Sequence, residues 1–192
     1  MDIQHCRTDR HGLRLLPGNA VVYAWYEFYP NPAYYAGALT NLTPGHMMSA
    51  TVSYNAVNGE FTAQITDLSD PALTFSTTFA PPPPSRHRNS FPAVQLSSAK
   101  WIAEAPCCSR NGDVLPLANF GTILFGDASS ISGSGTCSAT VNGTSGTIGS
   151  FGPSAWFQTT MVSAKTDAPK ATPSSLTPDG GGFSVTWDSV GP

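Results

Sequence analysis

Short stretches in which apolar and polar residues alternate run along most of this chain, and they predict β-strands. Residues 47–54 and 61–68 show the pattern best, because their apolar or aromatic side chains recur with the period of two that a half-buried strand requires. Asn58-Gly59 lies between them, and this dipeptide is typical of a tight hairpin turn. The pattern therefore predicts a β-hairpin in this part of the chain.

Further strand-like stretches follow one another at short spacing, separated by turn residues. They are residues 21–29, 73–79, 99–104, 119–125, 137–141, 156–164 and 183–187. No stretch shows the longer period of a helix of useful length, and many short strands with frequent turns are typical of a sandwich or a barrel. We therefore expect an antiparallel, all-β domain.

Composition narrows the class of protein. The chain has 192 residues, which suits a single domain, and 11% of them are charged, against about 25% in an average soluble domain. Hydrophobic residues make up 40%, which is too many for a disordered chain. The net charge of −3 comes without a basic patch, so we expect no nucleic-acid partner. No apolar run approaches the roughly 20 residues of a membrane span, so we expect no membrane insertion either.

Residues 1–19 differ in composition from the rest. They hold three of the nine Lys and Arg residues and two of the four histidines, and they begin without the apolar core of a signal peptide. We expect 1–19 to be an atypical segment in front of a domain that spans 20–192, and Met1 not to be the natural start.

Four cysteines, Cys6, Cys107, Cys108 and Cys137, allow three complete disulfide pairings, among which the sequence does not choose. No pair has the spacing of zinc ligands, so we expect no metal site. Cys107 and Cys108 follow Pro106 in an expected loop and do not indicate a nucleophile. Nucleophile-elbow, metalloprotease and phosphate-loop motifs do not occur, and His46 is expected to be a solvated turn residue.

Two strand-like segments place a glutamate among apolar or aromatic residues. In the first, alternation puts Tyr23, Trp25, Glu27 and Tyr29 on one face of a strand. In the second, Glu104 ends an apolar strand, where a rigid scaffold can present a side chain to a cleft. The alternative for each is a glutamate that simply reaches solvent, Glu27 from an edge strand and Glu104 from a strand end.

The chain resembles the glutamic peptidases, also called eqolisins, over residues 20–188. Three segments carry the resemblance in the same order and spacing as in the family: Tyr23-Ala24-Trp25-Tyr26-Glu27-Phe28-Tyr29-Pro30, Trp101-Ile102-Ala103-Glu104-Ala105-Pro106 and Leu115-Pro116-Leu117-Ala118-Asn119-Phe120-Gly121-Thr122-Ile123-Leu124-Phe125. Two closing segments follow, Pro173-Ser174-Ser175-Leu176 and Phe183-Ser184-Val185-Thr186-Trp187. The Pro44-Gly45 turn and the closing segments are similar to those of the bacterial-type members.

This resemblance implies a two-sheet, lectin-like (concanavalin A-like) β-sandwich and a secreted endopeptidase that is active at acid pH without metal or cofactor. Glu104 matches the catalytic glutamate, which acts as general base on water and then as general acid toward the leaving amine. Trp25 and Glu27 match positions that line or brace the family's cleft, and Tyr29 shares their face. We expect a polypeptide substrate and a monomer.

The chain departs from the family where the partner glutamine belongs. The family glutamine stands in a Leu-Gln-x-Gly context, whereas the only upstream glutamine here is Gln4, followed by His5-Cys6. The family's earlier Trp-x-Gly-x-Asp-Gly segment is missing, and Lys100 replaces a usual glutamate. Two alternatives to an active peptidase follow: a non-catalytic sandwich module that binds extended peptides or glycans, and a gene product without activity.

Overall fold

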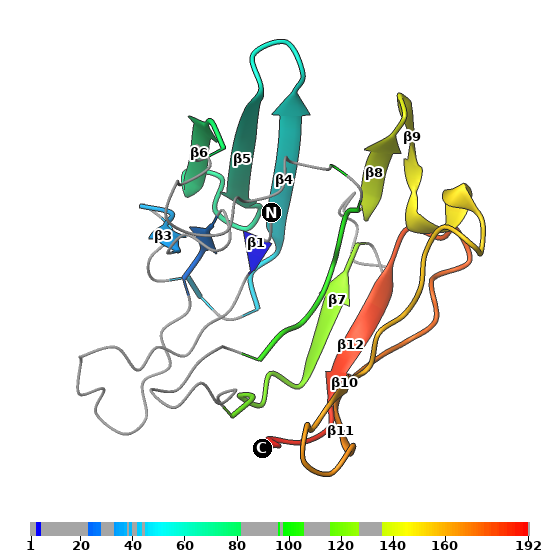
Figure 1. The fold of residues 1–192 in the computed structure, drawn as a ribbon. Helices are drawn as coiled ribbons and strands as arrows, with labels where there is room; N and C mark the ends of the chain where they lie inside the picture. Colours follow the sequence, from blue (N-terminus) through cyan, green and yellow to red (C-terminus); the bar gives the residue numbers. More distant parts are fainter. Residues whose placement is uncertain are drawn as a thin grey trace, which may run out of the picture. The chain divides into compact units, whose positions relative to one another are not determined.

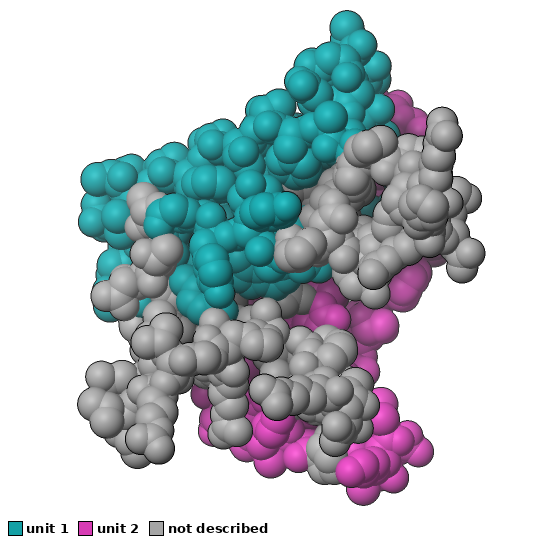
Figure 2. Space-filling model, turned by 60° about the vertical axis from the view of Figure 1, so that its left-hand side comes forward, with its two compact units in different colours: residues 1–100 teal, residues 101–192 magenta. Residues whose placement is uncertain are grey.

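The computed structural model describes residues 3–4, 23–27, 33–37, 39, 42–43, 45–81, 96, 98–105, 116–126 and 136–191, with residues 3–4 described for their backbone (Figure 1). The chain divides into two compact units, unit 1 with residues 1–100 and unit 2 with residues 101–192 (Figure 2). In the described ranges strands dominate both units, and every strand pair there is antiparallel. The fold is all-β, as expected of an antiparallel β-sandwich.

Unit 1 contains two three-stranded sheets. The longer strands are β4 (Met48–Asn55), β5 (Glu60–Asp67) and β6 (Thr74–Phe79), in the order β4-β5-β6. The second sheet is built from the two-residue strands β1 (Ile3–Gln4), β2 (Trp25–Tyr26) and β3 (Tyr34–Tyr35), in the order β1-β2-β3.

The core of unit 1 follows from the alternation along β5. Phe61, Ala63, Ile65 and Asp67 are buried, whereas Gln64 between them is exposed, so one face of this central strand carries the core. Ile65 clusters with the buried residues Ala24, Ala36, Leu39 and Leu42. Hence the chain that surrounds β2 and β3 packs on β5.

Unit 2 contains a four-stranded sheet and a separate hairpin. The sheet has the order β10-β11-β12-β7, formed by β10 (Met161–Val162), β11 (Pro169–Pro173), β12 (Phe183–Trp187) and β7 (Thr122–Phe125). The hairpin pairs β8 (Ser138–Val141) with β9 (Thr144–Thr147), and a single 3-10 turn, η1 (Ile148–Phe151), follows. Ala105, Leu117, Ala171 and Val185 form the buried cluster of this unit.

The strands with the clearest alternation lie where the sequence predicts them. β4 and β5 form the expected hairpin around residues 56–59, and β6, β8 and β12 match within one residue. Asn142 and Gly143 adopt φ values of 51° and 80°, the backbone that a tight turn between twisted strands needs.

Other predictions are wrong. Residues 99–104 belong to no strand, although Ala103 packs on the core of unit 2 as an alternating segment would. In residues 156–164 only Met161 and Val162 pair. β11 was not predicted, because prolines at both of its ends resemble loop boundaries. Residues 82–95 lie outside the described part of the chain.

Candidate functional site

β2 presents one face to a small hollow. Tyr23 and Trp25, which alternation places on the same side, line this hollow together with Ala33 and Tyr35. Its volume is about 140 Å³. The rings of Tyr23 and Tyr35 meet edge to face at a centroid distance of 5.0 Å. Tyr23 and Trp25 therefore border the same hollow, and the shared face of Tyr23, Trp25, Glu27 and Tyr29 stays a prediction.

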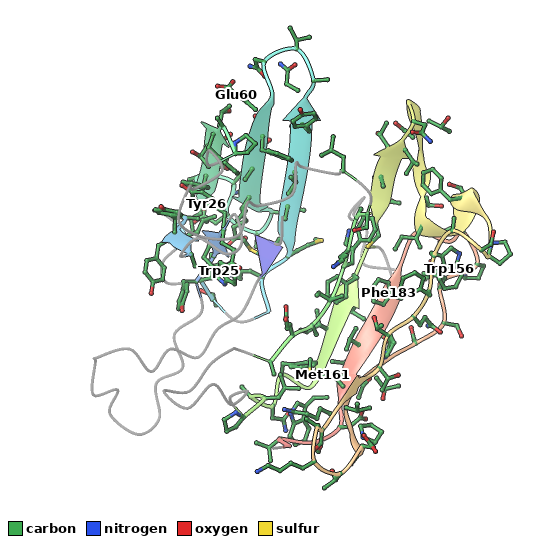
Figure 3. The ribbon with its side chains drawn as sticks, viewed as in Figure 1. Trp25, Tyr26, Glu60, Trp156, Met161 and Phe183 are labelled. Atoms are coloured by element: carbon green, nitrogen blue, oxygen red, sulfur yellow. The ribbon has the colours of Figure 1, made fainter. Side chains whose placement is uncertain are left out.

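The opposite face of β2 anchors the strand. The ring of Tyr26 stacks against Tyr34, Phe75 and Phe79, in each case at a centroid distance of 5.5 Å. Aromatic pairs of this kind add about 0.5–1.5 kcal/mol each to the energy of burial. Tyr26, labelled in Figure 3 close to Trp25, thus packs β2 against β6.

Trp25 carries a buried polar atom for which the described residues supply no partner. Its side chain is 7% exposed, and its indole Nε1 is buried without a hydrogen-bond partner among the described residues. A buried donor without an acceptor costs about 1–3 kcal/mol. An acceptor on a bound molecule would remove that cost.

The remaining candidates near β2 are placed as follows. Glu27 is partly buried directly after β2, whereas Tyr29 lies outside the described residues. The backbone of Gln4 pairs with that of Trp25 at the edge of the small sheet. This pairing places Gln4, the only glutamine that precedes Trp25 in the sequence, beside β2 in the backbone ladder.

Glu104 is exposed on the side of its segment that faces away from the core. Ala103 packs against the core of unit 2 and Ala105 is part of it, whereas Ile102 and Glu104 are exposed. Alternation therefore turns the Glu104 carboxyl outward, although the segment is not a strand. Glu104 belongs to unit 2, and Gln4, Trp25 and Glu27 belong to unit 1, so their meeting at one cleft stays a prediction.

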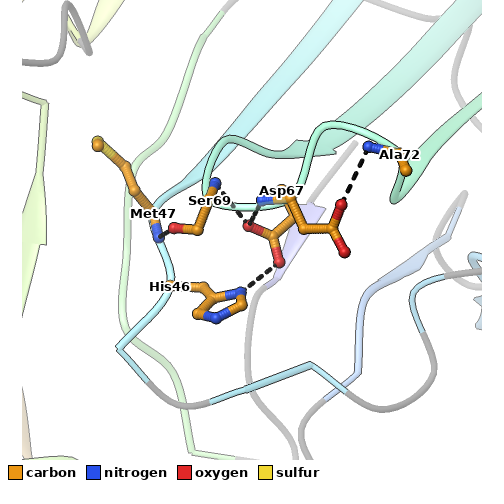
Figure 4. Close-up of polar contacts among 6 residues, drawn as sticks. His46, Met47, Asp67, Ser69 and Ala72 are labelled. Atoms are coloured by element: carbon orange, nitrogen blue, oxygen red, sulfur yellow. Dashed lines mark hydrogen bonds and ion pairs between the residues drawn. The ribbon is translucent and has the colours of Figure 1, made fainter.

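Sequence reasoning missed a polar pair in unit 1, and the expectation that His46 is merely solvated is wrong. His46 Nδ1 donates to Asp67 Oδ2 over 2.6 Å (Figure 4). The residues are 21 positions apart, and the pairing of Met48 with Asp67 in the β4–β5 ladder brings them together. An apolar strand ending in Asp, opposite a strand preceded by His, is the signal that could have revealed the pair.

The surroundings of Asp67 explain how its charge is tolerated. Oδ1 accepts hydrogen bonds from the N–H groups of Ser69 and Asp70, at 2.8 and 3.1 Å. Burial alone would raise the pKa of the Asp67 carboxyl, but the hydrogen bond from His46, the two from the backbone and the nearby imidazole charge together hold this pKa below its usual value. Asp67 is therefore an ionised group inside the fold.

Other features limit the chemistry of the described residues. Burial raises the pKa of the Cys137 thiol to about 11, so this cysteine is a poor nucleophile at neutral pH. Within the described ranges, no three His, Cys, Asp or Glu side chains gather as metal ligands would. The same ranges hold no helix with the length and hydropathy of a membrane span.

The comparison with protein families decides the relationship. The model of the peptidase A4 family matches residues 8–177, which is most of the chain. The chain belongs to the peptidase A4 family. This is the family of the glutamic peptidases, or eqolisins, so the resemblance found in the sequence is confirmed.

The matched range includes the segments around Trp25, Glu27 and Glu104 but not Gln4, and it begins inside the segment 1–19. A comparison with curated proteins finds no match, and a comparison with solved structures finds none either. Family membership supports a peptidase with a polypeptide substrate in general terms.

Proposed function

We propose that this chain is a secreted, monomeric, acid-active endopeptidase of the glutamic type. The observation that carries the proposal is the family match over residues 8–177, which spans both glutamate segments. Exposure of Glu104 on the side away from the core supports it, because a catalytic carboxylate must reach both water and substrate.

In this proposal Glu104 performs both proton transfers. Its carboxylate takes a proton from a water molecule while the water oxygen attacks the carbonyl carbon of the peptide bond. The resulting tetrahedral intermediate collapses when the protonated carboxyl returns that proton to the amide nitrogen and the C–N bond breaks. Neither step needs a metal or a covalent enzyme intermediate. General acid–base catalysis of this kind contributes about 10²–10⁴-fold to a rate.

The oxyanion needs a second group, and Gln4 is the candidate. A side-chain amide can donate to the developing negative charge, and loss of one such donor typically costs about 10²–10³-fold in rate. The pairing of the Gln4 backbone with Trp25 supports this role. The absence of Gln4 from the matched range argues for the alternative, a sandwich module that binds peptides or glycans without cleaving them.

The aromatic hollow on β2 suits a substrate side chain. A volume of about 140 Å³ is close to that of cavities that hold a benzene-sized group. Trp25 would contact the substrate there and gain an acceptor for its indole N–H. Glu27 and Tyr29, which follow on the same strand-like segment, would extend the contact.

Digestion of a reduced and alkylated protein between pH 2 and 8, followed by mass spectrometry of the fragments, tests the proposal. We expect cleavage with an optimum near pH 3–4, roughly where a carboxyl group is partly ionised. Glu104→Gln should abolish it and Gln4→Ala should reduce it strongly. Glu60→Gln is the control, since Glu60 lies at the start of β5 and its carboxylate accepts a hydrogen bond from Asn58 in the hairpin turn.

Binding of the same substrate, followed by fluorescence anisotropy at pH 4, separates the alternatives. A peptidase variant with Glu104→Gln should still bind but not cleave. If the unchanged chain binds the substrate and cleaves nothing over the whole pH range, the binding-module alternative replaces the peptidase proposal.

A further inference from the structure

β4 lies at an open edge of its sheet. The strand order β4-β5-β6 gives β4 a partner on one side, and among the described residues no strand pairs with its other side (Figure 1). None of its eight residues is buried: Met48 is partly buried, and the other seven are exposed. A strand in this position presents a row of unpaired backbone N–H and C=O groups to solvent.

Two hydrogen bonds show which backbone groups of β4 point outward. The Leu68 N–H donates to the Met47 carbonyl over 2.7 Å, so Met47 turns this carbonyl toward β5. In an antiparallel ladder the direction alternates from residue to residue, so Met48 turns its backbone groups away from β5. The N–H of Asp67, which lies opposite Met48, accordingly donates on the β6 side, to the Leu73 carbonyl over 3.0 Å. The outward backbone groups of β4 therefore belong to Met48, Ala50, Val52 and Tyr54.

The side chains of the same four residues form an apolar face of β4. In the ladder they lie opposite four buried residues of β5: Asp67, Ile65, Ala63 and Phe61. Val52 and Tyr54 are nevertheless 40% and 38% exposed. Tyr54 ends a row of rings that continues through Phe61 to Phe79, with centroid distances of 4.9 and 6.3 Å. The apolar face of the sheet therefore extends to its open edge.

The sequence of β4 contains none of the features that prevent a further strand from pairing. Residues 47–59 include no Asp, Glu, Lys, Arg, His or Pro. The ladder with β5 pairs every residue from Met48 to Asn55 in turn, so no bulge bends the strand. Charges, prolines and bulges are the usual means by which proteins protect an edge strand. The edge of β4 is therefore open to pairing.

The opposite edge of the same sheet, formed by β6, differs in its apolar face. Phe75 and Phe79 are partly buried there, and both stack against the ring of Tyr26. A strand added beside β6 would find this face already occupied. A strand added beside β4 would cover Val52 and Tyr54, so β4 is the edge that gains apolar contact from a ligand.

We propose that β4 binds an extended polypeptide as an added strand, with apolar side chains at alternate positions of the ligand. The ligand's backbone pairs with the outward N–H and C=O groups, and its alternate side chains cover the apolar face of β4. A polypeptide fits because its donors and acceptors repeat with the spacing of the strand. Only the choice of a polypeptide rests on the proposed function, in which the substrate is a polypeptide. Strand addition itself needs no cleavage.

Fluorescence anisotropy with the full chain carrying Glu104→Gln, which lacks the proposed cleavage, tests strand addition. The probe is a labelled peptide of alternating valine and threonine that has the length of β4. The control peptide carries N-methyl groups on two adjacent central residues, which removes a donor from each of its edges. We expect the probe to bind at least about tenfold more tightly than the control, because each methyl group replaces a hydrogen bond. Equal binding of both peptides, or binding of neither, would overturn the proposal.

Two proline variants separate strand addition from folding. Val52→Pro removes an outward N–H, whereas Thr51→Pro removes the N–H that faces Gln64 in the ladder. We expect Val52→Pro to weaken binding of the probe at least about tenfold, since it loses a donor and places a ring at the edge. Its melting temperature should fall less than that of Thr51→Pro. Unchanged binding by a folded Val52→Pro chain would contradict the proposal.

Amide hydrogen exchange followed by NMR needs no substitution in β4. In the free Glu104→Gln chain, the amides of Ala50 and Val52 should exchange faster than those of Thr51 and Ser53, because only the latter two face the ladder. A saturating concentration of the probe should slow exchange at Ala50 and Val52 at least about tenfold. Exchange that the probe slows elsewhere but not at these two amides would place the peptide outside β4 and overturn the proposal.

Sedimentation velocity of the same chain distinguishes a peptide from a second copy as the occupant of β4. We expect one species of monomer mass, with and without the probe. A dimer that Val52→Pro abolishes and the probe does not dissociate would show that the edge pairs with itself, and the peptide proposal would fall.

The outcomes for strand addition and for cleavage are separate. If the unchanged chain digests its substrate while the probe does not bind at β4, strand addition is wrong and the proposed function stands. If the probe binds at β4 in a chain that cleaves nothing, strand addition stands and the proposed function falls.

Discussion

Asp67 carries its charge where water does not reach, and three donated hydrogen bonds make that possible. A charge buried without partners would cost several kcal/mol, so the fold around it is organised to supply donors. Because these bonds exist only in the folded chain, the ionised carboxylate contributes to stability.

The sign of the pKa shift sets the pH range of that contribution. The pKa of Asp67 is lowered from its ordinary 3.8, so the stabilisation is fully present above that pH and is lost as the pH falls through the lower, folded value. Urea unfolding at pH 2 to 5 should therefore show that Asp67→Asn is less stable than the unchanged chain at pH 5, with a difference that narrows toward pH 2. A difference that widens toward pH 2 would contradict this assignment.

Cys137 is buried, and its thiol is expected to react slowly with alkylating reagents. Its side chain is 4% exposed, and burial raises the pKa of its thiol to about 11. Iodoacetamide at pH 8 should therefore label Cys137 many times more slowly in the folded chain than in urea, as peptide mass spectrometry can measure. Rapid labelling of the folded chain would show that this part of unit 2 opens easily.

At the scale of elements, the sequence predicts well those strands that their own residues specify, and predicts poorly those that depend on neighbouring strands. The β4–β5 hairpin and β12 are specified locally, by alternating side chains and turn residues, and they were predicted closely. β11 is a strand because it lies between β10 and β12, and neither its composition nor Pro169 and Pro173 indicate this. Within residues 99–104, partly buried and exposed side chains alternate from Trp101 to Glu104 as they do in a strand. Alternation shows which side chains face the core, but a strand also needs a neighbouring strand to pair with.

Two glycines flanking β7 offer a matched comparison of backbone strain with steric overlap. Gly121 and Gly126 have φ values of 67° and 69°, in the left-handed region that non-glycine residues avoid. A Cβ at Gly121 would meet nothing within 4 Å, whereas a Cβ at Gly126 would overlap the backbone carbonyl of Gly181. The two positions thus share the strain but differ in the space available.

Alanine substitutions at these positions should differ accordingly. Gly121→Ala is expected to lower the free energy of unfolding by about 1–2 kcal/mol, from strain alone. Gly126→Ala should lower it by clearly more, because the carbonyl of Gly181 must also move away from β7. Guanidinium unfolding of both variants measures the difference, and equal losses would mean that the loop containing Gly181 yields without cost.

At the scale of the whole molecule, the family could be recognised from sequence because its segments keep their order and spacing around Trp25 and Glu104. The outward direction of Glu104 also follows from alternation, since Ala103 and Ala105 are the apolar members of its segment. The His46–Asp67 pair follows from no single strand pattern, because it also depends on the register that pairs Met48 in β4 with Asp67 in β5. Likewise, only the ladder reveals the neighbour of Gln4 in β1.

The central claim is that Glu104 supplies the proton transfers of a glutamic peptidase. Its most direct test is the ratio of kcat/KM between the unchanged chain and Glu104→Gln, measured on one fluorogenic peptide at about pH 4, with Glu60→Gln in parallel. We predict a loss of at least about 10²-fold for Glu104→Gln, in line with removal of a general base, and a change of less than twofold for Glu60→Gln. Cleavage by the Glu104→Gln chain at the rate of the unchanged chain would contradict the account.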